Sequence, residues 1–283
     1  RKMKKTIIYS FLVLFASCFI AANSNTTSVV NTRSNNDSLP QLPLLASIKV
    51  QGNQVNSDPV ENYYISTNTS IWKTSSQNNQ SFIYDSKKSG NITLIDAGDP
   101  MKILVFYKDL SLITFLDNFM AETSFNISLM DFGLDQAEVV CKSLNNGIWV
   151  YDVKQDKLVK ISNALKVEIE ILNIQRIIGE AFSPKQMMER TTGLYLNDPT
   201  KGIYVFDNYG SFLRKIPELN ISKFNVIENT IAFRQANDIN TLNTRTLEFN
   251  KIYSDSIMTD FSINEKKLYI LNADSLHIYK LNP

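Results

Sequence analysis

The sequence contains few of the residues on which most catalytic and metal sites depend. In 283 residues it has one histidine, His277, and two cysteines, Cys18 and Cys141. This composition provides no zinc or iron ligand set and no spare base for a Ser-His-Asp triad. Glycine-rich phosphate loops are also missing. We therefore expect no catalytic residues, no metal and no cofactor, and we interpret His277 as structural.

The chain also lacks an excess of either charge. Lys and Arg number 29 against 28 Asp and Glu, which leaves a formal charge of +1. No overall field gathers nucleic acid or an anionic membrane surface. Acidic pairs such as Asp96 and Asp99, or Asp152 and Asp156, fall on predicted turns, where side-chain to backbone hydrogen bonds account for them. We expect no nucleic-acid partner and no calcium loop.

Glycine and proline are scarce, with nine and eight residues, so the turns must be built largely from Asn, Asp and Ser. Hydrophobic residues make up 43% of the chain, enough for one large domain with a sizeable core. Aromatic residues are plentiful in the strand-like runs. We interpret them as core between stacked sheets, with a stacking platform for sugars as the alternative.

Short apolar runs recur along the chain at a nearly regular spacing. Six of them end at Asp85, Asp117, Asp152, Asp207, Asn243 and Lys280, so the intervals are 32, 35, 55, 36 and 37 residues. A repeat of this length made of strands is typical of a blade in a β-propeller. The Asp that closes four of these runs is interpreted as a turn cap. We predict an all-β, six-bladed propeller of four-stranded antiparallel blades.

The last predicted unit, from Phe261 to the end of the chain, has three strands where a blade needs four. An open ring would leave two unpaired strand edges. The run Leu44–Val50 belongs to no other unit. We predict that it pairs with Leu276–Leu281 and closes the ring.

The interval of 55 residues indicates an insertion between Asn163 and Thr192. Residues 166–171 alternate with the period of a strand, whereas 183–190 resemble one or two helical turns, with Ser183 as N-cap and Pro184 at the first position. Insertions on regular scaffolds often carry function. The alternative is a longer strand pair with a decorated loop.

The amino-terminal segment, residues 1–22, reads as a signal peptide. Four basic residues precede the apolar stretch Ile7–Ala22, which is short for a bilayer span of about 20 residues. Residues 14–18 resemble a bacterial lipobox that ends at Cys18, the candidate lipidation site. Cleavage after Ala22 and an uncleaved anchor are the alternatives. We expect export to the periplasm or outer membrane of a Gram-negative bacterium, with membrane contact only through lipid on Cys18.

Residues 23–43 are rich in Asn, Ser and Thr and lack apolar periodicity, which predicts a flexible linker before a propeller at residues 44–283. If Cys18 is acylated or removed, Cys141 has no disulfide partner. It lies in a strand-like run, so we expect a buried and unreactive thiol.

Two of the runs have similar sequences. Residues 147–152 are Gly-Ile-Trp-Val-Tyr-Asp, and residues 202–207 are Gly-Ile-Tyr-Val-Phe-Asp. With them the chain resembles the NHL/YVTN-like six-bladed propellers, and with its signal peptide it resembles exported propeller lipoproteins of Bacteroidota envelopes. The resemblance implies a rigid ring whose loops bind a partner, and its motifs specify fold and not activity. Our first hypothesis is a non-catalytic scaffold or assembly factor that binds another envelope protein. A carbohydrate or small-ligand binder is the second, and a propeller hydrolase or lyase the third. The binding residues are left open.

Overall fold

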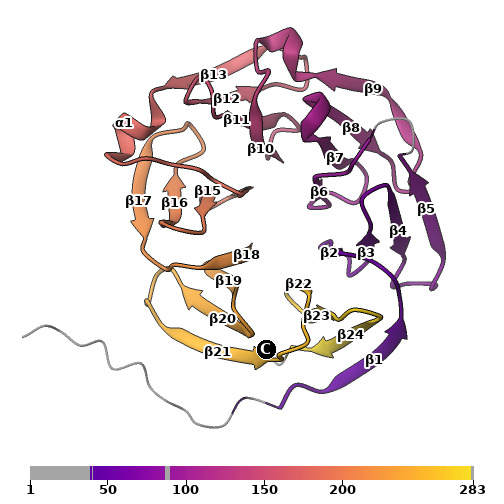
Figure 1. Ribbon diagram of the computed structural model, residues 1–283. Helices are drawn as coiled ribbons and strands as arrows, with labels where there is room; N and C mark the ends of the chain where they lie inside the picture. Colours follow the sequence, from indigo (N-terminus) through magenta and orange to yellow (C-terminus); the bar gives the residue numbers. More distant parts are fainter. Residues whose placement is uncertain (1–38, 40, 87–89, 282–283) are drawn as a thin grey trace, which may run out of the picture. The chain divides into compact units, whose positions relative to one another are not determined.

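In a computed structural model of the chain, the described residues are 39, 41–86 and 90–281. The chain divides into two units, Arg1–Asn35 and Asn36–Pro283, and the first lies wholly outside the described residues. The signal peptide, Cys18 and most of the linker predicted above therefore also lie outside them. In the second unit, six four-stranded sheets stand around a central axis (Figure 1). The prediction of a six-bladed β-propeller is confirmed.

Five blades are consecutive in the sequence, and every strand pair in them is antiparallel. Blades 1 and 2 contain β2 (Gln54–Ser57), β3 (Tyr63–Ser66), β4 (Ser70–Thr74), β5 (Ser81–Asp85), β6 (Leu94–Asp96), β7 (Ile103–Tyr107), β8 (Leu112–Leu116) and β9 (Glu122–Ser128). Blades 3 and 4 contain β10 (Ala137–Lys142), β11 (Ile148–Asp152), β12 (Lys157–Ile161), β13 (Val167–Leu172), β14 (Gln186–Arg190), β15 (Gly193–Asp198), β16 (Gly202–Phe206) and β17 (Phe212–Ile216). Blade 5 contains β18 (Ile221–Ile227), β19 (Thr230–Gln235), β20 (Asp238–Asn243) and β21 (Phe249–Ser254).

The sixth blade joins the two ends of the described chain. It consists of β22 (Asp260–Ile263), β23 (Lys267–Leu271), β24 (Ser275–Lys280) and β1 (Leu44–Lys49). Strand β1 lies antiparallel to β24, with Ser47 opposite His277 and Ile48 opposite Leu276. The predicted closure by the run that begins at Leu44 is confirmed, and it covers the edge of β24 that would otherwise be unpaired.

Each blade is held to the next by its own hydrophobic core. Six clusters of buried side chains exist, and each draws on two neighbouring blades. Strand β11 shows how the sequence achieves this: Ile148 and Val150 pack toward blade 2, whereas Trp149 and Tyr151 pack toward blade 4. Successive side chains of a strand point to opposite faces. A strand buried on both faces is therefore apolar at every position, as the repeated runs are.

The glycine that opens the two similar runs has a steric reason. A Cβ on Gly147 would stand 2.3 Å from the backbone oxygen of Ile161, and a Cβ on Gly202 would stand 2.3 Å from that of Ile216. Both oxygens belong to the neighbouring strand of the same blade. Only glycine allows the hairpin to begin so close to its neighbour.

The predicted helix at 183–190 is wrong, and no separate insertion is present. Residues 186–190 form β14, the first strand of blade 4, and residues 167–172 form β13, the fourth strand of blade 3. The connection between them carries the short helix α1 (Ile174–Ile178); two 3-10 turns, η1 (Lys108–Leu110) and η2 (Leu129–Phe132), lie elsewhere. The long interval arises because Asp152 ends a second strand, whereas Asp207 follows a third strand.

The sequence groups the apolar run at 92–95 with the strand-like runs at 63–65, 70–72 and 82–84 as one unit, and this grouping needs correction. The run at 92–95 leads into β6 of blade 2, and β2 is the first strand of blade 1. Strand β2 is short and polar, so its sequence does not stand out. Within the described part of the chain, no helix is long and apolar enough to cross a membrane.

Candidate functional site

The residues that the sequence analysis singled out make contacts within strands and turns where the structure describes them. His277 lies in β24, where its Nε2 is 3.2 Å from the hydroxyl of Ser275. Asp96 and Asp99 each accept the backbone N–H two positions further on, as expected for turn residues. Among the described residues, no group of three or more His, Cys, Asp or Glu could hold a metal ion. Cys18 lies outside the described residues.

Three of the four aspartates that end the repeated runs, Asp117, Asp152 and Asp207, are turn caps, as predicted. The Oδ1 atom of Asp117 accepts two backbone N–H groups in the following turn, at 2.8 and 2.9 Å, and that of Asp207 does the same. Asp152 accepts the N–H groups of Gln155 and Gln136. These carboxylates therefore shape the hairpins.

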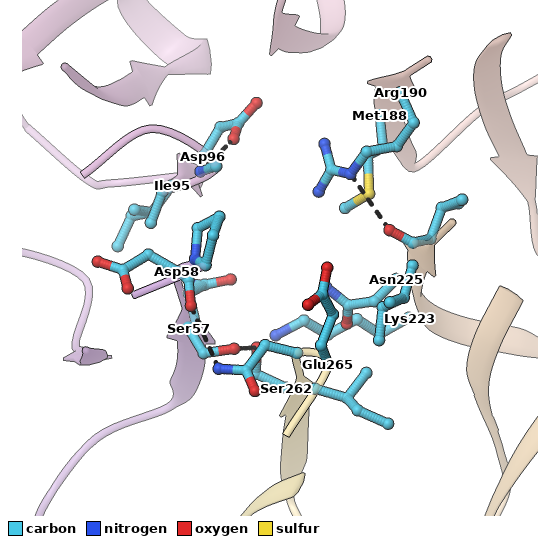
Figure 2. A pocket seen from close by; sticks show the side chains of 18 of the residues that line it. Ser57, Asp58, Ile95, Asp96, Met188, Arg190, Lys223, Asn225, Ser262 and Glu265 are labelled. Atoms are coloured by element: carbon cyan, nitrogen blue, oxygen red, sulfur yellow. Dashed lines mark hydrogen bonds between the residues drawn. The ribbon is translucent and has the colours of Figure 1, made fainter. Parts of the chain in front are cut away.

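A cavity of about 330 Å³ opens at the centre of the ring. It is bounded by residues of all six blades, mostly at or just after the carboxyl ends of the innermost strands (Figure 2). The first strand of each blade ends at this face of the ring, so residues far apart in the sequence meet there. A cavity of this size is in the range of small-molecule sites.

Each carboxylate oxygen of the two aspartates of this cavity accepts at least one hydrogen bond from the protein. The Oδ2 atom of buried Asp58 accepts hydrogen bonds from Asn62 and from the hydroxyl of Tyr64, and its Oδ1 accepts backbone N–H groups. The Oδ1 of Asp96 accepts a backbone N–H of its own turn, and its Oδ2 accepts that of Lys142 in blade 3, at 2.8 Å. Both carboxylates are committed to holding the backbone.

Lys223 of β18 is also committed. Its ammonium group lies 2.8 Å from the Oδ2 atom of Asp260 and 2.7 Å from the backbone oxygen of Val55. The same carboxylate oxygen accepts the N–H of Val55 at 2.8 Å. This cluster joins blades 5, 6 and 1, so its role is to fasten the ring.

Arg190, at the end of β14, is bonded differently. Its Nε donates to the backbone oxygen of Val226 at 3.2 Å and its Nη1 to that of Glu189 at 2.8 Å. No ion pair joins it to a carboxylate of the described residues. Its guanidinium points into the opening of the cavity, and the carboxylate of Glu265 projects into the same opening (Figure 2). Arg190 is a cation of this site with hydrogen-bonding capacity left for a ligand.

The rest of the cavity wall is aliphatic and polar. Ile95 and Met188 supply apolar surface, and the buried Oδ1 of Asn225 has no hydrogen-bond partner. The described lining contains no aromatic side chain, so this cavity offers no stacking platform for a sugar ring. The strand aromatics lie in the cores between blades, as predicted, with Trp72 as a partly exposed exception.

A smaller hollow of about 170 Å³ lies between blades 2 and 3. Lys102 closes it, with its ammonium 4.4 Å from the ring centre of Phe115 and 2.8 Å from the Oδ1 of Asn163. Burial lowers the pKa of Lys102, and nearby Lys142 lowers it further. Because Lys102 fills the opening, the central cavity is the better candidate.

None of the side chains that give the central cavity its character was identified from the sequence. Arg190 and Met188 lie in the segment predicted to be helical, and Glu265 lies in a turn with no motif. The feature of the sequence that could have identified them is their position at or just after the carboxyl end of the first, innermost strand of a blade. That feature could not be used because β2 and β14 were not recognised as strands.

No family model matches the chain, and no curated protein sequence matches it. Solved structures share its fold. Virginiamycin B lyase from Staphylococcus aureus is 11% identical with a TM-score of 0.58, and the match covers 86% of this chain and all of the lyase chain (100%). The WD40 domain of Pan2 from Neurospora crassa is 7% identical with a TM-score of 0.56, over 86% and 90% of the two chains.

PorZ of Porphyromonas gingivalis, described as an essential bacterial surface component of the type-IX secretion system, is 10% identical with a TM-score of 0.50. The match covers 85% of this chain and 39% of PorZ. These likenesses, all at low identity, show a propeller fold that lyases and surface components share. They do not transfer an activity, because one fold supports many functions.

Proposed function

We propose that this protein is a non-catalytic binding propeller of the cell envelope that holds a small ligand in its central cavity. The observation that supports this proposal is Arg190, whose guanidinium faces the opening without a carboxylate partner among the described residues. Ligand sites combine apolar walls with a few well-placed polar groups. The aliphatic wall and Arg190 fit that description.

The state of Asp58 and Asp96 favours a binding role over catalysis by either of them. A general base needs an oxygen that can accept a proton from the substrate. The oxygens of Asp58 and Asp96 already accept protein N–H or O–H groups. The only histidine lies in β24 of blade 6 and does not line the cavity.

The proposal is tested by filling the cavity. We expect the full chain, incubated with a small-molecule extract of its source cells, to retain a bound compound in native mass spectrometry. Asn225→Phe, which places a ring inside the cavity, should lose it. Asn237→Phe, in an exposed turn of the same blade, should keep it. Equal retention by both variants, or no retention by the unmodified chain, would contradict the proposal.

A protein-binding scaffold is the second candidate, and an exposed apolar pair favours it. Trp72 on β4 and Ile83 on β5 are cross-strand neighbours, and they are 36% and 57% exposed. Exposed aromatic and aliphatic side chains that lie together often mark contact sites. A pull-down from envelopes should recover one stoichiometric protein that Trp72→Lys abolishes. Recovery of the same protein by both forms would rule out this surface.

The proposal includes export and anchoring through lipid on Cys18, as the sequence predicts. Mass spectrometry of the mature amino terminus tests it. A diacylated Cys18 supports the anchor, whereas a mature chain that begins at unmodified Asn23 supports plain secretion.

A further inference from the structure

The charged groups of the central cavity differ in how well they are neutralised. Both oxygens of Asp58 and of Asp96 accept hydrogen bonds from the protein, and Lys223 is paired with Asp260. Arg190 donates two of its N–H groups to backbone oxygens. A guanidinium carries five donors, so three are left for other acceptors.

Gly98 lies beside Arg190, in the turn after β6 of blade 2. A Cβ on Gly98 would stand 3.1 Å from the Oδ1 atom of Asp96 and 3.8 Å from the Nη1 atom of Arg190. The guanidinium therefore extends from blade 4 past blade 3 to blade 2. Any larger residue at Gly98 would project a side chain beside this group.

A partly buried cation that makes no direct ion pair is unfavourable, since it loses hydration without gaining a contacting partner. A bound carboxylate would supply the missing charge. It would also accept two parallel N–H···O bonds from the fork of a guanidinium, and such charge-assisted bonds are stronger than neutral ones.

On these grounds we infer that the ligand of the central cavity carries a carboxylate group that binds to Arg190. This inference rests on the proposed ligand-binding role. Exposed Glu228 and Glu265 lie at the mouth, and the carboxylate of Glu265 projects into the same opening (Figure 2). Two nearby negative charges disfavour a doubly charged phosphate. The aliphatic surface of Ile95 and Met188 suits an organic body of modest size.

The methyl group of Met188 provides a reporter within the cavity. The chain has seven methionines, so methyl-labelled methionine gives a simple NMR spectrum in which Met188→Leu identifies the signal. The probes are butanoate and 4-methylpentanoate, each compared with its amide, and inorganic phosphate. We expect the carboxylates to shift the Met188 signal at millimolar concentration and the amides to bind at least tenfold more weakly.

Three variants sharpen the test. Arg190→Gln should weaken carboxylate binding about 10- to 100-fold, in keeping with the loss of charge-assisted hydrogen bonds. Arg176→Gln, on exposed helix α1, should leave it unchanged. Glu265→Gln is exposed and should fold normally, and it should tighten carboxylate binding by removing a like charge.

Any one of four results would overturn the inference. Two concern the choice of ligand: equal shifts from acids and amides, or stronger binding of phosphate than of carboxylates. The other two are unchanged binding in Arg190→Gln and no shift up to 20 millimolar. If Arg190→Gln fails to fold, weaker binding in Glu265→Gln would still overturn it. Loss of a captured compound in Asn225→Phe together with equal binding of acids and amides would leave the proposed function standing and reject the carboxylate.

Discussion

Single buried side chains connect neighbouring blades near the centre of the ring, and Glu189 is the clearest of them. It lies in β14 of blade 4 with its side chain fully buried. One carboxylate oxygen accepts the indole N–H of Trp149 at 2.9 Å and lies 3.5 Å from the ammonium of Lys160; the other accepts the N–H of Leu144. All three partners belong to blade 3. Glu189 thus holds the strand that presents Arg190 to the cavity.

Glu189→Ala should lower the free energy of unfolding by about 3–5 kcal/mol, because it leaves the charge of Lys160 and the indole N–H buried without a partner. Denaturant unfolding measures this change. The matched control is Glu168→Ala on β13, where the side chain is exposed and the expected change is below about 0.5 kcal/mol. Similar losses in the two variants would contradict the assigned role.

Cys141 is buried in β10, as the sequence analysis predicted. Burial raises the pKa of its thiol well above the ordinary value, and the charges of Asp96 and Glu189 raise it further. The thiolate that reacts with disulfide reagents is therefore suppressed.

We expect Cys141 in a Cys18→Ser chain to be inert toward Ellman's reagent in the native state and to react fully in guanidinium. The absorbance of the aromatic thiolate that the reagent releases measures the reaction in both states. Rapid reaction of the native chain would show that blade 3 opens in a way that its packing does not indicate.

At the scale of elements, strand β1 has the most demanding role. It is far from the rest of blade 6 in the sequence, yet it covers the edge of β24. Alternation decides which of its residues matter: Ile48 packs against the core between blades 6 and 1, whereas Leu45 is 51% exposed.

Ile48→Asp should destabilise the ring by about 2–4 kcal/mol, because a carboxylate replaces a packed aliphatic side chain and weakens the closure. Leu45→Asp should stay within about 1 kcal/mol of the unmodified chain. Thermal unfolding of both variants provides the test. If Leu45→Asp proves the more damaging, the register of β1 against β24 is wrong.

At the scale of the whole molecule, charged contacts between blades link stability to pH. Glu138 in blade 3 lies 2.6 Å from the ammonium of Lys108 in blade 2 and 2.7 Å from that of Lys185, which precedes blade 4. Burial acts to raise the pKa of Glu138, but the hydrogen bonds and charges of both lysines outweigh it and hold the pKa below 4.5. The unfolded chain therefore takes up this proton at a higher pH than the folded chain does.

The stabilisation from Glu138 should be complete above about pH 5 and should be lost as the pH falls through its depressed native pKa. Glu138→Gln should accordingly be less stable than the unmodified chain at pH 7, and the difference should shrink toward about pH 3. Unfolding curves across this range measure it. A difference that does not change with pH would show that the lysines do not stabilise the charged form.

A feature of this fold could be predicted from the sequence where its physical cause leaves a pattern in neighbouring residues. The apolar run around Trp149 predicted a strand of a blade correctly, since a strand buried on both faces must be apolar throughout. The prediction failed at 183–190, where Ser183 and Pro184 imitate a helix start. A helix confined to 183–190 would be too short to be stable by itself, and the pairing of β14 with β15 supplies backbone hydrogen bonds instead.

The sequence by itself determined the class of fold, the number of blades and the strand that closes the ring, because burial on both faces and the need to pair every edge leave their pattern in local residues. Only the tertiary structure decided the site. Arg190, Gly98 and Glu265 stand in three different blades, and they meet because the ring brings the ends of its innermost strands to one opening. No local pattern records that convergence.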